Sequence, residues 1–159
     1  MANRIDDLLA GVLAYLQDDT ATPAISTEFA TIKTYLPSEA ALKQTALMPI
    51  LAVHVLSVTD VLARMPKGRD VSYSLAFDIL YSVSSDNETD EQKEALRLAD
   101  LVHQKIQNDP SLGSTSNLMV AGAVTDGGWG DEPLEQLLGA LGVLGWRWTV
   151  PARELPNPT

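Results

Sequence analysis

The sequence predicts an α+β fold: a mixed or antiparallel β-sheet built around a long hairpin, with helices packed on one face. Three patterns in the 159-residue chain support this prediction. Residues 71–83 alternate apolar and mostly polar side chains, which is the period of a half-buried strand. Residues 3–17 and 86–108 instead repeat apolar side chains every three or four positions, as amphipathic helices do. Such a set of elements favours a sheet covered by helices on one side.

The N-terminal helix is predicted from one apolar stripe across residues 3–17. Its members are Ile5, Leu8, Leu9, Val12, Leu13 and Leu16. Residues 20–23 break the pattern and end with a proline. Residues 24–47 permit either a short strand or a helix, interrupted by Pro37, and both alternatives stay open.

Two strands joined by a turn follow from residue 50. Residues 50–58, ILAVHVLSV, are rich in β-branched side chains and short enough for a half-buried strand. Residues 63–70, ARMPKGRD, contain the turn formers proline and glycine. In the second strand the odd positions form the core face: Val71, Tyr73, Leu75, Phe77, Ile79, Tyr81 and Val83. A slip of one residue would expose this set, so we expect a long antiparallel hairpin of fixed register, with a mostly polar second face.

A long helix is predicted over residues 86–108. Its first turn is rich in carboxylates, which oppose the positive end of the helix dipole, and Thr89 with Gln92 offers a capping box. An Asn-Asp-Pro sequence at 108–110 ends the helix.

The C-terminal third is predicted to add two strands. They cover residues 117–125 and 142–151, separated by a glycine-rich loop at 126–132 and a short helix that starts at Pro133. The last strand alternates again, with Leu144, Trp146, Trp148 and Val150 on the core side.

The composition is that of one globular domain, with 45% hydrophobic and 20% charged residues. We place this domain at residues 1–151 and expect a loose, proline-rich tail at 152–159. The chain shows no secretory pattern and no run of ~20 uninterrupted apolar residues, so we expect a cytoplasmic product without membrane contact.

Charge and cysteine content narrow the function classes. The absence of cysteine excludes disulfides, thiolate metal sites and cysteine nucleophiles. The formal net charge of −10 repels phosphate, which disfavours a DNA-gripping protein. It is compatible with an acidic wall past which nucleic acid slides without sticking.

No catalytic, metal or cofactor constellation is recognisable. His54 lies in an apolar strand, where a hydrogen-bonded sheet histidine is far commoner than a ligand. His103 has no further imidazole or carboxylate at the helical spacing that a metal site needs. Calcium loops, phosphate-binding loops and nucleophile elbows are absent from the sequence. We therefore expect a non-enzymatic protein without cofactors that contacts other protein subunits.

Two segments are candidate contact surfaces. Three cations gather at the hairpin turn of this acidic chain, and they suit either a solvated turn or an arm that meets an acidic neighbour: Arg64, Lys67 and Arg69. The glycine-rich loop places an aromatic side chain beside two carboxylates: Trp129, Asp131 and Glu132. The tryptophan suits an interface anchor or a local cap on the core equally well.

The order of these features resembles the tail terminator proteins of long-tailed bacteriophages, also called minor tail or tail-to-head joining proteins. The resemblance covers residues 3–151 and rests on short motifs. They are P-I-L-A-V-H-V at 49–55, the long hairpin, D-P-S-L-G at 109–113 and G-W-R-W-T-V at 145–150. The family's helix exit reads D-P-[ST]-L-G-G, and Ser114 replaces its second glycine.

The resemblance implies a six-membered ring that caps the tail tube, stops its polymerisation and presents a docking surface for the head-side connector. The implied partners are further copies of the chain, the tail tube protein and a connector or neck protein, while genome DNA passes through without specific binding. The implied location is the head-proximal end of the virion tail, and the host cytoplasm during assembly. The alternatives are another head–tail connector or neck (tail completion) protein, or a non-enzymatic protein-binding module, with an enzyme a disfavoured third class.

Overall fold

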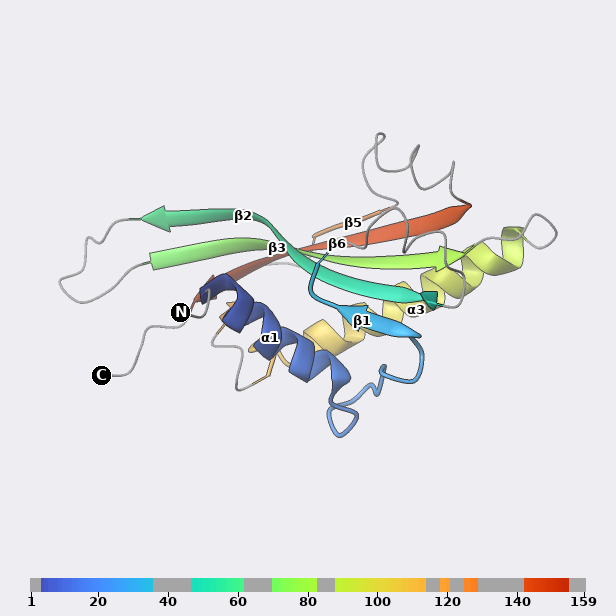
Figure 1. Ribbon diagram of the computed structural model, residues 1–159, viewed down its shortest axis with the longest axis horizontal. Helices are drawn as coiled ribbons and strands as arrows, with labels where there is room; N and C mark the ends of the chain where they lie inside the picture. Colours follow the sequence, from blue (N-terminus) through green and yellow to red (C-terminus); the bar gives the residue numbers. More distant parts are fainter. Residues whose placement is uncertain are drawn as a thin grey trace.

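The computed structural model describes residues 4–35, 47–61, 70–82, 88–113, 118–120, 125–128 and 142–154. Within them the predicted α+β fold is confirmed (Figure 1). The elements in chain order are α1 (Arg4–Gln17), β1 (Thr31–Lys33), β2 (Ile50–Val61), β3 (Asp70–Ser82), α3 (Glu88–Asn108), β4 (Leu118–Val120), β5 (Thr125–Gly128) and β6 (Val143–Glu154).

The strands form one mixed sheet in the order β1-β2-β3-β6-β4, with β5 also paired to β6. Only β1 and β2 run parallel among these pairs, and the others are antiparallel. The predicted long hairpin is present, since β2 and β3 pair from Ile50↔Leu80 to Val61↔Asp70. On its other side β3 pairs with β6 over its whole length from Ser72 to Ser82. The strand predicted from alternation alone therefore lies at the centre of the sheet.

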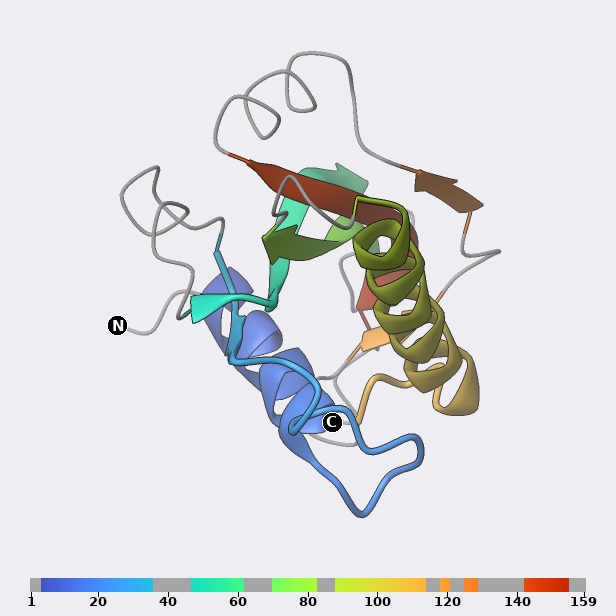
Figure 2. The ribbon, with the colours of Figure 1, turned by 90° about the vertical axis from the view of Figure 1, so that its right-hand side faces the viewer.

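Both helices cover the same face of the sheet (Figures 1 and 2). The core between them is made of the odd positions of β3 and the apolar stripes of α1 and α3. Phe77, Val12 and Val102 are fully buried there. Each such side chain stabilises the fold by roughly 1.5–3 kcal/mol through burial alone. This apolar layer fixes the register that the sequence predicts, because a one-residue slip would turn it toward water.

The second face of the sheet is less polar and more buried than the sequence predicts. Ala76, Asp78 and Leu80, at even positions of β3, are all nearly inaccessible to solvent. A small apolar cluster on this face contains Ile50, Ala52, Leu80 and Val143. The central part of β3 is thus buried on both faces, and its charged residue needs partners.

A buried lysine joins the two helices. Lys105 of α3 is fully buried, and its Nζ donates hydrogen bonds to the carbonyl oxygens of Asp18 and Ala21 at 2.7 and 2.5 Å. The same ammonium lies 4.9 Å from the centre of the Tyr15 ring, and the Tyr15 hydroxyl donates to the Lys105 carbonyl at 2.6 Å. Burial lowers the pKa of Lys105, against the opposing effect of Asp18 and Asp19. The ammonium thereby donates to carbonyl groups of the segment that follows α1, in place of water.

Residues 24–47, for which strand and helix stayed open, contribute the short strand β1. It is held beside β2 because the backbone N–H groups of Ala30 and Thr31 both donate to the Pro49 carbonyl. Residues 36–46 lie outside the described residues.

Several predicted boundaries need correction. The strand predicted over 117–125 is described as β4 and the start of β5, and β5 continues into the segment predicted as a loop. Residues 152–154, predicted as the start of a loose tail, belong to β6, and Ala152 packs into the core. Residues 155–159 lie outside the described residues. The helix α3 begins at Glu88, so Thr89 lies inside it and not at the position that precedes a helix. Within the described residues, none of the helices combines the length and the apolar character needed to span a membrane.

Candidate functional site

The predicted contact residues lie in two segments that the structure does not describe. Arg64, Lys67 and Arg69 fall between β2 and β3, and Trp129, Asp131 and Glu132 follow β5. Their role in contacts stays a prediction. The structure does describe the strands that lead into the first segment, which are paired up to Val61↔Asp70.

The outer end of the β2–β3 hairpin extends past the N-terminal end of α1 (Figure 1). Its two strands are held differently. On β3, Tyr73 is buried and its hydroxyl donates to Glu154 of β6 at 3.2 Å. On β2, a bulge between Val55 and Ser57 leaves Leu56 without an opposite residue, and Leu56 is 43% exposed. The hairpin is therefore anchored through β3 and presents β2 to its surroundings.

Large exposed apolar side chains gather at the edges of the sheet. At the β2 edge they are Leu56 and Val58, 43% and 44% exposed, and at the β4 edge Met119 is 43% exposed. Among described strands, β1 pairs with β2 only from Ile50 to Ala52, so the rest of that edge has no described neighbour. Natural edge strands are usually protected by charge, proline or a covering element, because open edges recruit other chains. An unprotected apolar edge is suited to a protein contact.

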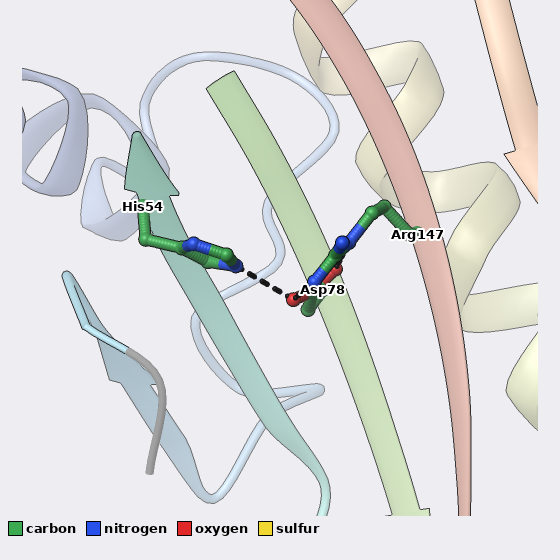
Figure 3. Close-up of polar contacts among 3 residues, drawn as sticks. All are labelled: His54, Asp78 and Arg147. Atoms are coloured by element: carbon green, nitrogen blue, oxygen red, sulfur yellow. Dashed lines mark hydrogen bonds and ion pairs between the residues drawn. The ribbon is translucent and has the colours of Figure 1, made fainter. Parts of the chain in front are cut away.

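A polar network crosses the second face of the sheet at its centre. Asp78 of β3 accepts a hydrogen bond from Arg147 Nε at 2.7 Å and another from Arg147 Nη2 at 2.9 Å. On the other side, His54 Nε2 of β2 lies 2.7 Å from Asp78 Oδ2 (Figure 3). Three neighbouring strands are thus linked through one carboxylate.

The environment of Asp78 explains its ionisation. The carboxylate is almost completely buried, which by itself raises its pKa. Hydrogen bonds and charge from Arg147 and His54 outweigh that effect, so the net pKa is below its ordinary value. The charged form is the one that the site favours, and it fixes the orientation of Arg147 and His54.

His54 therefore has the structural role that the sequence suggested, a hydrogen-bonded histidine within the sheet. Its partners were not predicted. Asp78 occupies an even position that the alternation assigned to a polar face, and Arg147 lies 69 positions further along the chain. The sequence did contain one indication of this partner. Arg147 lies between two tryptophans that were predicted to face the core, and because side chains alternate along a strand, its own side chain lies on the second face.

His103 packs against β6. Its ring stacks on Trp148 with centroids 4.6 Å apart, and the Trp148 Nε1 donates to the Ala99 carbonyl at 2.9 Å. Across the part of the chain that the structure describes, no three His, Asp or Glu side chains gather in a way that would hold a metal ion.

The D-P-S-L-G motif at 109–113 forms a tight turn after α3. The Asp109 carboxylate accepts hydrogen bonds from the Ser111 hydroxyl and from the backbone N–H groups of Ser111 and Gly113. Leu112 and Gly113 then adopt positive φ values of 51° and 86°. The turn reaches β4 through a 2.7 Å hydrogen bond from the Val120 N–H to the Pro110 carbonyl. The motif is a structural joint between α3, α1 and β4.

Comparison with known proteins gives a fold relationship. No family model matches the chain, and no curated protein sequence does. Among solved structures, a chain from the virion of a native gene transfer agent particle superposes with a TM-score of 0.50 at 12% sequence identity. The match covers 97% of this chain and 98% of the other. At this identity the likeness shows a shared fold over the full length of both chains.

Proposed function

We propose that this chain is a structural protein of a phage-like virion. The observation that carries the proposal is the full-length fold match to a subunit of a gene transfer agent virion, a phage-like particle. More specifically, the chain is a tail terminator, which caps the tail tube, stops its polymerisation and offers a docking surface to the head-side connector. The motifs of that family at residues 49–55, 109–113 and 145–150 support the finer assignment.

The functional unit of this proposal is a homohexameric ring at the head-proximal end of the tail. The formal charge of −10 per chain supports a channel for DNA, because an acidic wall gives passing phosphates no counterion gain. The network of Asp78, His54 and Arg147 links the three central strands of the sheet.

The hairpin serves as an arm in this assembly. Arg64, Lys67 and Arg69 at its turn would meet an acidic surface on the tube or on a neighbouring copy. Trp129, Asp131 and Glu132 supply an aromatic anchor with a polar rim at a second contact. The protein performs no chemistry in this role and needs no cofactor.

Growth of tail tubes in the presence of the purified chain tests the function. Substoichiometric protein should stop elongation, so that electron microscopy shows shorter tubes with extra density at one end. Tubes of unchanged length, without added density, contradict the tail-terminator assignment.

Charge reversal tests the arm. Arg64→Glu, Lys67→Glu and Arg69→Glu should each weaken capping, and their combination should abolish it. The matched control is Lys93→Glu, which makes the same charge change at an exposed position of α3. All variants should keep wild-type stability within about 0.5 kcal/mol, since surface changes rarely cost more. Equal capping by the triple variant and wild type rules out the arm.

The alternative functions predict different behaviour. Another head–tail connector or neck protein would bind the portal end of filled heads and leave tube growth unchanged. A non-enzymatic binding module would stay a monomer or dimer and would join neither structure. Light scattering separates this last class, because a hexamer has six times the 17.1 kDa mass of the chain.

A further inference from the structure

We infer that neighbouring copies in the ring contact each other through opposite edges of their sheets. The β2 edge of one copy, at Leu56 and Val58, packs against Met119 on the β4 edge of the next. This inference rests on the proposed ring and names the surface that closes it. The occupant of each edge is thus a second copy of this chain.

The exposure pattern is the first support. Among the described residues, five large hydrophobic side chains are exposed: Tyr35, Leu56, Val58, Leu96 and Met119. Three of them lie on β2 and β4, which occupy opposite sides of the sheet order β1-β2-β3-β6-β4. Tyr35 follows β1 on the β2 side, and only Leu96 lies away from the sheet, on α3. Apolar side chains therefore mark both ends of one sheet.

Charge is the second support. A chain of net charge −10 repels its own copies, so a surface stretch without carboxylates favours contact between them. Residues 50–59 and residues 117–125 contain no Asp, Glu, Lys or Arg, and the nearest carboxylates beyond them are Asp60 in β2 and Asp126 in β5. The exposed apolar side chains of β2 and β4 thus lie in uncharged stretches of the two edges. Edge strands that avoid association usually carry the opposite signature, an exposed charge or a proline.

Symmetry determines how the edges combine. A ring of identical copies needs a heterologous contact, in which two different patches of each copy meet. The β2 and β4 edges are different patches at opposite ends of the sheet, which is what head-to-tail closure requires. The Val120 N–H already donates to the Pro110 carbonyl, so β4 offers the Met119 side chain and not a free ladder of backbone groups. The contact is therefore apolar side-chain packing.

Two charged variants test the contact. Leu56→Lys and Met119→Glu should each weaken self-association by on the order of tenfold or more, because each leaves a charge in an apolar contact. The matched controls are Leu96→Lys and Leu96→Glu, which alter a similarly exposed leucine on α3. The controls should assemble as wild type does. Size-exclusion chromatography with light scattering gives the masses, and circular dichroism verifies that each variant is folded.

Mixing the two variants tests the head-to-tail arrangement. Each variant alone should assemble at least about tenfold more weakly than wild type, since every contact would contain one charge against an apolar partner. In the mixture, copies that alternate around the ring make one wild-type contact and one contact between lysine and glutamate. Assembly should therefore return on mixing. A Met119→Glu protein that assembles normally, while Leu56→Lys does not, shows that β2 meets β2 and overturns the arrangement.

The outcomes separate this inference from the proposed function. If wild-type rings cap tubes but Leu56→Lys forms rings as readily as Leu96→Lys, the proposed function stands and the edge contact is overturned. If the variants weaken ring assembly as expected but the wild-type rings leave tube growth unchanged, the edge contact stands and the proposed function is overturned. A wild-type chain that stays monomeric at its highest soluble concentration overturns the contact between copies. Protection of β2 amides from hydrogen exchange only when tubes are added assigns the edge to the tube protein, which also overturns it.

Discussion

At the residue scale, the turn at 109–113 shows why one glycine in the helix exit has a strict requirement. Gly113 has a φ of 86°, a region that side chains disfavour, and a Cβ added there would lie 2.8 Å from the Cβ of Tyr15. The close approach lets the turn pack against α1. The positive φ and the close approach of Tyr15 both act on residue 113. A change in the backbone alone, or a movement of Tyr15 alone, would therefore not remove the strain of an added side chain.

Gly113→Ala should therefore destabilise the fold by about 2 kcal/mol or more, from the strained φ and the overlap with Tyr15. Urea unfolding followed by circular dichroism measures the change. An unfolding midpoint equal to that of wild type contradicts the described geometry of the turn.

Asp78 makes the second prediction at this scale. Asp78→Asn keeps the shape of the side chain but removes the buried charge that accepts two hydrogen bonds from Arg147, which should cost about 2 kcal/mol at neutral pH. Because folding lowers the pKa of Asp78, its stabilisation is full above the ordinary pKa of 3.8 and is lost as pH falls through the lower, folded value. The difference between variant and wild type should shrink in that acidic range.

Urea unfolding at neutral and acidic pH measures both effects. Asp100→Asn is the control, since Asp100 is an exposed carboxylate of α3 bonded to Gln104. It should change stability by no more than about 0.5 kcal/mol at either pH. A stability difference for Asp78→Asn that persists unchanged into acid contradicts the role given to this charge.

At the element scale, the period of the apolar residues was sufficient to predict a helix or strand wherever one face of the element is buried and the other is not. Because their apolar residues recur at the period of the element, α1 and β3 were predicted to within one residue of their described ends. The strands β2 and β6 were also predicted, but each runs three residues further than expected, to Val61 and Glu154. The core position of Trp146 and Trp148 was also correct, since both pack against the main cluster.

Prediction failed where long-range contacts decide the structure. The central part of the second face of β3 is buried although it contains an aspartate, because Arg147 and His54 are partners of the Asp78 carboxylate. The buried Lys105 was assigned to no site, since its carbonyl partners lie more than 80 positions away. Neither pairing leaves a periodic signal in the sequence.

The two faces of β3 give a prediction for the hairpin. Phe77→Asp should prevent folding, because it places a charge without a partner in the main core. Ser72→Asp is the matched control on the same strand, where the side chain is exposed, and it should fold normally. Far-ultraviolet circular dichroism and the cooperativity of thermal unfolding distinguish the two. A cooperatively folded Phe77→Asp protein would exclude the described core.

At the scale of the whole molecule, the proposed function depends on an acidic charge and on apolar side chains at both edges of a sheet whose three central strands are linked through Asp78. In the proposal, the acidic charge suits a surface that DNA passes, and the apolar edges suit repeated contact between copies. The fold itself is shared with a chain of a gene transfer agent virion.

The acidic charge gives a prediction at this scale. The purified chain should show no saturable binding to duplex DNA at physiological salt, because its net charge of −10 repels phosphate. Fluorescence anisotropy of a labelled duplex measures this. Saturable binding that weakens steeply with added salt is the result that a DNA-gripping protein would give.

The most direct test of the central claim is cryo-electron microscopy of tail tubes assembled with the purified chain. The account predicts one six-fold ring of this protein on a single end of each tube, with its sheets joined around the ring through the edges that hold Leu56 and Met119. Density for the chain at the portal of the head, or tubes whose ends carry none of it, would contradict the account.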